Sequence, residues 1–307
     1  MTAPPGAGPG GPAGVSGAAP GGTAGGASGA APGGTAGAGP GGAPGRGVLV
    51  TGGGTGIGAA VARTLAAGGD RVAILGRRPE LLRAVAAETG ALAVVGDVSD
   101  PAQVSSAVSR AVAEFGSLDG LVLNAGVISP GGVADLAPAD WAAMVSVNLT
   151  GAFLVAQAAL PHLISARGAI VSVASVAALR AASGMGGYAA TKAGLTMLTQ
   201  SIAVDHAHQG VRANVVCPGW TVTAMADEEM AALGAARALP VPEAYELVTA
   251  LVPQRRPAQA SEVAAVVAWL LSAAASYVNG AVIPVDGSAS AVDVGTLAFD
   301  PRVQLRP

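Results

Sequence analysis

The stretch TGGGTGIG, residues 51–58, decides the fold, and it follows directly on the apolar run Val48, Leu49 and Val50. A strand that ends in glycines and leads into a helix leaves bare N–H groups at the helix N-terminus, where the helix dipole attracts phosphate. The alternative is flexible filler, since residues 1–45 are also rich in glycine. The rest of the chain decides between these two interpretations.

From Gly47 onward, short apolar runs alternate with longer, Ala-rich helical patterns. Strands are expected at residues 47–51, 71–75, 91–95, 119–123, 168–173, 211–216 and 281–285. Helices are expected at residues 56–68, 79–89, 101–115, 139–163, 187–209 and 260–274. Continuous rather than alternating apolar runs are typical of strands that helices cover on both faces. The pattern therefore predicts an α/β fold, a single-domain, doubly wound parallel sheet of Rossmann type.

Segments at both ends depart from this domain, which is expected to span residues 46–290. Residues 1–45 are almost wholly Gly, Ala, Pro, Ser and Thr and should be a disordered tail, because they cannot bury enough apolar surface to offset the entropy of ordering. Residues 291–307 form a C-terminal extension. Inside the domain, the irregular, proline-punctuated helical segment 224–257 is expected to be a substrate lid.

Composition excludes several classes of function. The net charge is −3, and no basic cluster is denser than a pair of arginines, so neither nucleic acid nor an anionic membrane is an expected partner. One cysteine, Cys217, rules out an internal disulfide, fits the cytoplasm and is expected to be a small buried hydrophobe. The three histidines suggest no metal site. The uncharged stretch 263–285 is long enough for a membrane span, but Asn279–Gly280 and Pro284 favour a buried helix followed by a buried strand.

Further motifs follow the glycine stretch in order. They are GDVSD at 96–100, LNAG at 123–126, VNLTGAF at 147–153, IVSVASV at 170–176, YAATK at 188–192, CPGWTVT at 217–223 and VNGAVIPVDGS at 278–288. Between about Gly47 and Gly287, this set resembles the short-chain dehydrogenase/reductase family, in its single-domain type with TGxxxGxG and YxxxK motifs.

Tyr188 and Lys192 are four residues apart on an expected helix and therefore share a face. A tyrosine ordinarily titrates at about 10, and a nearby ammonium favours the phenolate, so Lys192 should lower the pKa of Tyr188. The resemblance implies that Ser175, rather than Ser172, holds the substrate oxygen. It also implies that Asn148 kinks its helix and holds a water that links Lys192 to solvent. The expected catalytic set is thus Asn148, Ser175, Tyr188 and Lys192.

The same resemblance implies a nicotinamide cofactor. Gly52 would allow a tight turn, Gly56 a close approach of backbone to phosphate, and Gly58 close helix packing on the strand. By resemblance, Asp97 receives the adenine amino group, and the loop at Pro218 receives the nicotinamide end. The expected cofactor-binding residues are Gly52, Thr55, Gly56, Ile57, Gly58, Arg77, Arg78, Asp97, Val98, Asn124, Ala125, Gly126, Tyr188, Lys192, Pro218, Gly219, Thr221 and Thr223.

The residues after the second expected strand bear on the choice of nucleotide. NAD-dependent members generally place Asp at the position of Gly76, to bind the ribose hydroxyls. Here Gly76 leaves room and Arg77 supplies a cation, with Arg78 as a second candidate, so NADP is favoured over NAD. An arginine that stacks on adenine would instead be compatible with NAD.

The resemblance predicts an NAD(P)-dependent oxidoreductase that interconverts a secondary alcohol and a ketone, as a ketoreductase on a hydrophobic small molecule. The apolar pocket is expected from the lid, whose apolar residues are Met225, Met230, Leu233, Leu239, Val241, Tyr245 and Leu247. Steroid, polyketide, terpenoid and fatty acyl carbonyls all fit this description, in either direction of reaction.

Two alternatives stay open. A 3-oxoacyl-carrier-protein reductase would need a basic docking face, for which Arg167, Arg180 and Arg255–Arg256 are available. A non-catalytic nucleotide-sensing scaffold would have lost Ser175, Tyr188 or Lys192. The resemblance also implies a homotetramer or homodimer, packed through helices 139–163 and 187–209 and through the last strand, with Leu297 and Phe299 over a neighbouring subunit's site.

Overall fold

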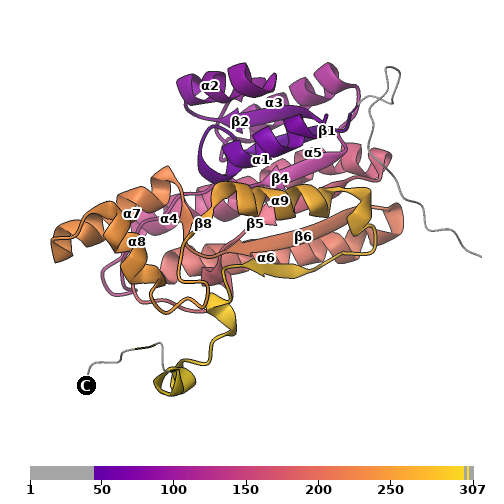
Figure 1. Cartoon of the computed structure of the whole chain (residues 1–307). Helices are drawn as coiled ribbons and strands as arrows, with labels where there is room; N and C mark the ends of the chain where they lie inside the picture. The colour runs from indigo at the N-terminus through magenta and orange to yellow at the C-terminus, as the bar shows by residue number, and fades with distance from the viewer. Residues whose placement is uncertain (1–44, 301–302, 304–307) are drawn as a thin grey trace, which may run out of the picture. The chain divides into compact units, whose positions relative to one another are not determined.

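Seven parallel strands form the central sheet in the order β3-β2-β1-β4-β5-β6-β9 (Figure 1). The strands are β1 Gly47–Thr51, β2 Arg71–Gly76, β3 Leu92–Val95, β4 Gly120–Leu123, β5 Ala169–Val173, β6 Arg212–Pro218 and β9 Val282–Val285. The order reverses between β1 and β4, which places a topological switch point at the carboxyl ends of these two strands. The predicted doubly wound parallel sheet is confirmed.

The structure is a computed structural model that describes residues 45–300 and 303. The expected disordered tail lies outside the described residues, apart from Gly45, as does part of the C-terminal extension. The helices are α1 Gly56–Ala67, α2 Pro79–Thr89, α3 Pro101–Phe115, α4 Pro138–Met144, α5 Ala152–Ala166, α6 Gly186–His206, α7 Ala224–Arg237, α8 Val241–Thr249 and α9 Ala260–Leu271. A two-stranded sheet, β7 Thr221–Val222 with β8 Ala258–Gln259, joins the two ends of segment 224–257, which is the expected lid.

Two hydrophobic layers sandwich the sheet. One layer joins α1, α2 and α9 to Val48 and Val50 of β1, and α1 and α9 lie side by side in Figure 1. The other joins α3, α5 and α6 to Leu49 of the same strand. Because successive residues of a strand point to opposite faces, burial on both sides requires an unbroken apolar run. This explains the sequence pattern that predicted the sheet.

The helix expected at residues 139–163 is interrupted. A π-helical stretch, Val145–Gly151, separates α4 from α5, with Asn148 buried at its centre. The whole span Pro138–Ala166 has the length and hydropathy of a membrane span. However, α5 buries Val155, Ala159 and Leu163 in the layer shared with α3 and the sheet, as a core helix does.

The apolar stretch 263–285 divides into α9 and β9, so the prediction of a helix followed by a strand is confirmed. The expected full burial of the strand is wrong. β9 is the last strand in the sheet order, and its residues are half-buried or exposed, because only β6 pairs with it.

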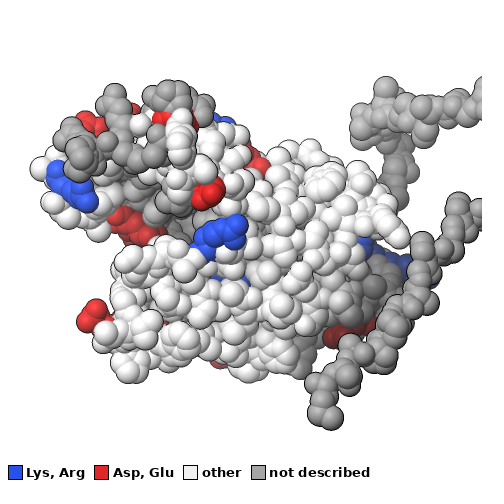
Figure 2. Space-filling model, turned by 90° about the horizontal axis from the view of Figure 1, so that it is seen from below, with Lys and Arg blue, Asp and Glu red and all other residues white. Residues whose placement is uncertain are grey.

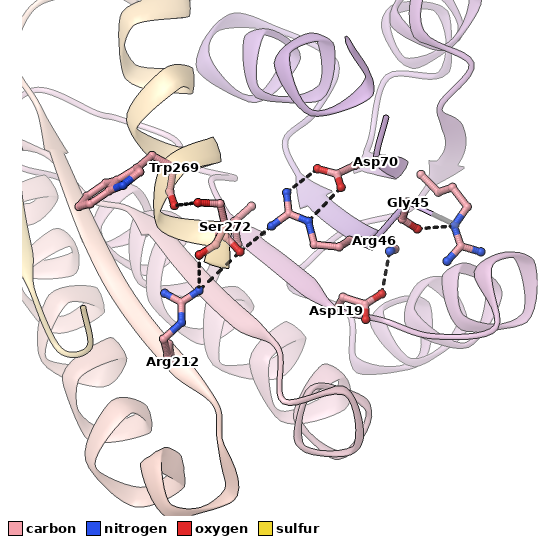
Figure 3. A network of polar contacts seen from close by, with 10 residues as sticks. Gly45, Arg46, Asp70, Asp119, Arg212, Trp269 and Ser272 are labelled. Carbon is pink, nitrogen blue, oxygen red and sulfur yellow. Dashed lines mark hydrogen bonds and ion pairs between the residues drawn. The ribbon is translucent and has the colours of Figure 1, made fainter. Parts of the chain in front are cut away.

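Two arginines bind the carbonyl groups at the carboxyl end of α9 (Figure 3). They lie at the amino ends of β1 and β6, whereas the switch point lies at the carboxyl ends of the strands. Arg212 donates from Nη1 to the Leu270 carbonyl at 2.8 Å and from Nη2 to the Ser272 carbonyl at 3.1 Å. Arg46 donates to the Leu271 carbonyl and forms an ion pair with Asp70, with 2.7 Å between Nη2 and Oδ2. Cations at a helix C-terminus satisfy its free carbonyls and oppose the helix dipole.

Replacing Arg212 by methionine should lower the free energy of unfolding by about 2–3 kcal/mol, because several charge-assisted hydrogen bonds to backbone carbonyls are lost. Urea denaturation of Arg212→Met and of Arg83→Met measures this, since Arg83 is exposed on α2. Equal stability of the two variants would contradict the assigned role.

Candidate active site

The glycine stretch forms a turn at the carboxyl end of β1. Gly52 has φ +66° and Gly56 has φ +52°, both in the left-handed region that favours glycine. A Cβ on Gly58 would lie 2.3 Å from the Gly52 carbonyl oxygen. The tight turn expected at Gly52 is thus present. Gly58 allows α1 to approach that turn, rather than the strand as expected.

Thr51 and Asn124 join the two strands of the switch point. The Thr51 Oγ1 accepts from the backbone N–H groups of Asn124 at 2.9 Å and Ala125 at 3.0 Å. The Asn124 Nδ2 donates to the Thr51 carbonyl at 2.9 Å and to the Gly52 carbonyl at 3.3 Å. We call these four bonds the Thr51–Asn124 clamp. Sequence reasoning gave Thr51 no role, although it is the first residue of the TGxxxGxG motif.

The four predicted catalytic residues come from three parts of the chain and lie near one another, with Tyr188 and Lys192 both on α6. Tyr188 is in the first turn of α6, and Lys192 is buried one turn later, donating from Nζ to the Val173 carbonyl at 2.9 Å. The Lys192 Nζ lies 5.6 Å from the Tyr188 ring centre. Ser175 caps the 3₁₀ helix Val176–Ala178 and forms a side-chain hydrogen bond with Tyr188.

The Asn148 side chain hydrogen bonds to the backbone of Val127 and to Thr191, the neighbour of Lys192 on α6. Its Oδ1 accepts from the Val127 N–H at 2.8 Å, and its Nδ2 donates to the Val127 carbonyl at 2.9 Å and to Thr191 Oγ1 at 3.1 Å. A Cβ on Gly126 would lie 3.4 Å from Lys192 Nζ and 3.5 Å from Asn148 Oδ1. The Lys192 ammonium and the Asn148 side-chain oxygen therefore both border Gly126.

Ser172 takes no part in this group. Its hydroxyl is fully buried and hydrogen bonds with Thr199 Oγ1 at 2.7 Å. This bond joins β5 to α6 in the core, which agrees with the choice of Ser175 over Ser172.

Burial has the largest effect on the pKa values of Tyr188 and Lys192. Burial raises the pKa of Tyr188 to about 12, while the hydrogen bond with Ser175 acts in the opposite direction. Burial also lowers the pKa of Lys192 to about 8. The charge of Lys192 is not among the causes that shift the pKa of Tyr188, and burial raises that pKa, so the lowering expected from Lys192 is not found in this structure.

A cavity of about 490 Å³ runs from the glycine turn to the lid. It is lined by every predicted cofactor-binding residue except Gly58, which lies behind the turn, and by Ser175. The predicted residues in its lining are Gly52, Thr55, Gly56, Ile57, Arg77, Arg78, Asp97, Val98, Asn124, Ala125, Gly126, Ser175, Tyr188, Lys192, Pro218, Gly219, Thr221 and Thr223.

Arg77 and Asp97 meet at the end of the cavity formed by β2 and β3. Arg77 Nη1 lies 3.9 Å from Asp97 Oδ2, and the arginine side chain is 62% exposed. Burial acts to raise the pKa of Asp97, but hydrogen bonds from Ser99 and the charge of Arg77 hold it below its ordinary value. The cavity therefore has both a cation and a carboxylate at this end.

The lid contributes less apolar surface to the cavity than expected. Met230 and Tyr245 are buried in the lid's own core, formed by α7 and α8, with Leu233 and Val241 packed against them. Of the seven apolar lid residues in the prediction, only Met225 lines the cavity. The prediction was wrong because α7 packs its apolar face, which includes Met230, against α8 and not toward the cavity. Glu229, which sequence reasoning missed, lines the cavity instead.

The family model described as enoyl-(acyl carrier protein) reductase matches residues 52–289, well over half of the chain. The chain belongs to the short-chain dehydrogenase/reductase family. It is 43% identical over 267 residues to protein MoaE of Klebsiella aerogenes, covering 83% of this chain and 99% of that protein. It is 37% identical over 255 residues to levodione reductase of Leifsonia aquatica, covering 80% and 94%.

A solved structure agrees with the sequence relatives. The actinorhodin polyketide ketoreductase with NADPH superimposes with a TM-score of 0.77 at 32% identity, covering 81% of this chain and 98% of that one. The short-chain dehydrogenase/reductase described here is accordingly an oxidoreductase with a nicotinamide cofactor.

Replacing Gly58 by alanine should destabilise the fold by about 1–3 kcal/mol, because the new Cβ would overlap the Gly52 carbonyl. Gly54→Ala is the matched control, since its Cβ would meet nothing closer than 3.4 Å. Thermal unfolding should show a lower midpoint for Gly58→Ala than for Gly54→Ala, and the reverse order would contradict the packing described.

Lys192 should give the stability of the protein a specific pH dependence. Between pH 8 and 10.5 the unfolded chain holds a proton on this lysine that the folded chain does not, so the lysine's contribution to stability rises with pH. The free energy of unfolding of the wild type minus that of Lys192→Met should therefore increase from pH 8 to 10. Taking the difference cancels the titration of groups that do not interact with Lys192, and a flat difference would contradict the burial of Lys192.

Proposed function

We propose that this chain is an NADP(H)-dependent ketoreductase that interconverts a secondary alcohol and a ketone. One observation carries the proposal. Ser175, Tyr188 and Lys192 meet in the same cavity that the glycine turn and Arg77 enclose at its other end. The rival of a non-catalytic scaffold predicts the loss of one of these three residues, and all three are in place.

The residues at the glycine turn fit a dinucleotide. Thr55, at the N-cap of α1, makes no side-chain capping bond, and the first turn of this helix carries no acidic residue. Its N–H groups are therefore free for an anion, and the glycines keep side chains away from them. Thr223, whose methyl would lie 3.1 Å from a Cβ on Gly56, borders the same end of the cavity.

The nicotinamide, when bound, supplies or accepts the hydride. In the reducing direction the Tyr188 hydroxyl gives its proton to the substrate oxygen, and the Ser175 hydroxyl holds that oxygen and stabilises its developing charge. A pKa of about 12 keeps Tyr188 protonated at neutral pH, which is the form that can give a proton to the substrate oxygen. We assign the reloading of the proton to Lys192 and to a water held by Asn148, whose Oδ1 keeps one lone pair beyond its bond from Val127.

The direct test of this function replaces Tyr188 by phenylalanine. Turnover of ketones with NADPH should fall by at least about 100-fold, because the proton donor is lost, while the affinity for NADPH stays within a few-fold. Tyr277→Phe, at a fully exposed tyrosine, is the control and should leave turnover unchanged. Undiminished turnover in Tyr188→Phe would overturn the assignment.

The preference for NADP rests on Gly76 and Arg77. The Arg77 side chain is exposed, and its ion pair with Asp97, at 3.9 Å, is long. Arg77 would therefore form charge-assisted hydrogen bonds with a 2′-phosphate. Arg77→Ala should therefore weaken NADPH binding by about 10–100-fold and leave NADH binding unchanged. Titration by nicotinamide fluorescence measures both, and equal losses for the two nucleotides would favour NAD and a stacking role for Arg77.

The carrier-protein alternative agrees with the description of the matching family model, but part of its expected docking face is taken up by ion pairs. Arg256 pairs with Glu262 at 2.7 Å, and Arg255 lies 3.9 Å from Asp300, so two of the four expected docking arginines already have carboxylate partners. We therefore propose a small molecule as the substrate.

We also propose a cytoplasmic homotetramer or homodimer, packed through α5 and α6. These helices expose Phe153, Met197 and Val204. Figure 2 shows a face whose surface is largely free of charged side chains. Such surfaces are typical of sites where protein chains associate.

A further inference from the structure

Glu229 is a carboxylate in the cavity that the reaction described above does not use. It lies on α7, half-buried, and lines the cavity together with Tyr188 and Met225. None of the hydrogen bonds or ion pairs among residues 45–300 and 303 involves its carboxylate. Its neighbour Asp227, by contrast, accepts a hydrogen bond from the Tyr245 hydroxyl at 2.9 Å.

The Glu229 carboxylate acts electrostatically on Tyr188 within the cavity that both residues line. Its negative charge contributes to the raised pKa of Tyr188, which requires proximity. Burial raises the pKa of Glu229 itself. A half-buried carboxylate without a partner is costly in a folded protein, and such groups gather at binding sites.

Of the described residues, five other charged side chains line the cavity, and one of them, Lys192, already donates to the Val173 carbonyl. Arg77, Arg78 and Asp97 come from the β2 and β3 end. Arg180 is exposed and already donates to the carbonyls of Leu179 at 2.9 Å and Ser290 at 3.1 Å. Because Glu229 offers only acceptors, it would repel an anionic substrate group and attract a hydrogen-bond donor.

We propose that Glu229 determines substrate specificity by accepting a hydrogen bond from a second donor group on the substrate, a hydroxyl or an ammonium next to the reacting carbon. The remaining lining near Tyr188 is mainly apolar, with Ile128, Val176, Met185, Trp220 and Met225. The preferred substrates are thus apolar skeletons that carry a diol, hydroxyketone or amino alcohol, not simple hydrophobic alcohols. This inference rests on the proposed function.

The test compares three alcohols of one skeleton, namely 2-butanol, 2,3-butanediol and 3-amino-2-butanol, each as its full set of stereoisomers. Oxidation is followed with NADP⁺ and with NAD⁺ for the wild type, Glu229→Gln and Glu229→Leu. Glu228→Gln is the matched control, because Glu228 is exposed on the same helix and undergoes the same change. Thermal unfolding and NADPH binding confirm that each variant is folded.

The wild type and Glu228→Gln should oxidise at least one donor-bearing alcohol with a kcat/KM about 10–100-fold above that of 2-butanol. Glu229→Leu should lose this preference. Glu229→Gln, which still accepts from a hydroxyl but has no charge, should retain a preference for the diol and lose one for the amine. The variant therefore distinguishes the two donors.

Two results would count against the inference in different ways. If the wild type oxidises all three alcohols but Glu229→Leu keeps its preference, or if 2-butanol is the best substrate, the role of Glu229 is overturned and the proposed function stands. If none of the alcohols is oxidised with either nucleotide, the proposed function fails, and the inference fails with it.

Discussion

The Thr51–Asn124 clamp is the interaction on which the active-site geometry depends. It ties the last residue of β1 to the first residues after β4, at the one place in the sheet where the strand order reverses. Asn124 also reaches the carbonyl of Gly52, so the same side chain that joins the strands fixes the glycine turn. Gly58 then brings α1 against this turn, which aims the helix N-terminus into the cavity.

Burial gives the reacting groups their chemical character. The same desolvation that raises the pKa of Tyr188 to about 12 lowers that of Lys192 to about 8, so two values that are ordinarily close together move apart and the ammonium becomes the stronger acid. A neutral phenol and a readily deprotonated amine, one helical turn apart, form a pair suited to passing a proton. The sheet provides this environment, since Lys192 points at the carboxyl end of β5 and bonds to Val173.

The sequence predicts well those features that depend on local pattern. Strand runs, the glycine turn and the four-residue spacing of Tyr188 and Lys192 are all local, and the fold confirms the first two. The lid was predicted less well, because packing against α8 turns Met230 inward and leaves Glu229 facing the cavity. The π-helical stretch also depends on a distant partner, Val127, which lies 21 residues from Asn148. The pKa of Tyr188 depends on burial, which spacing along a helix does not reveal.

Tracing the hydride tests the central claim most directly. The protein is incubated with a ketone and with NADPH deuterated at C4, in separate samples for each face of the ring, and the alcohol is analysed by mass spectrometry. The account predicts one deuterium on the carbinol carbon from one face only, with the oxygen-bound proton drawn from solvent. Nucleotide binding without deuterium transfer from either face would contradict it.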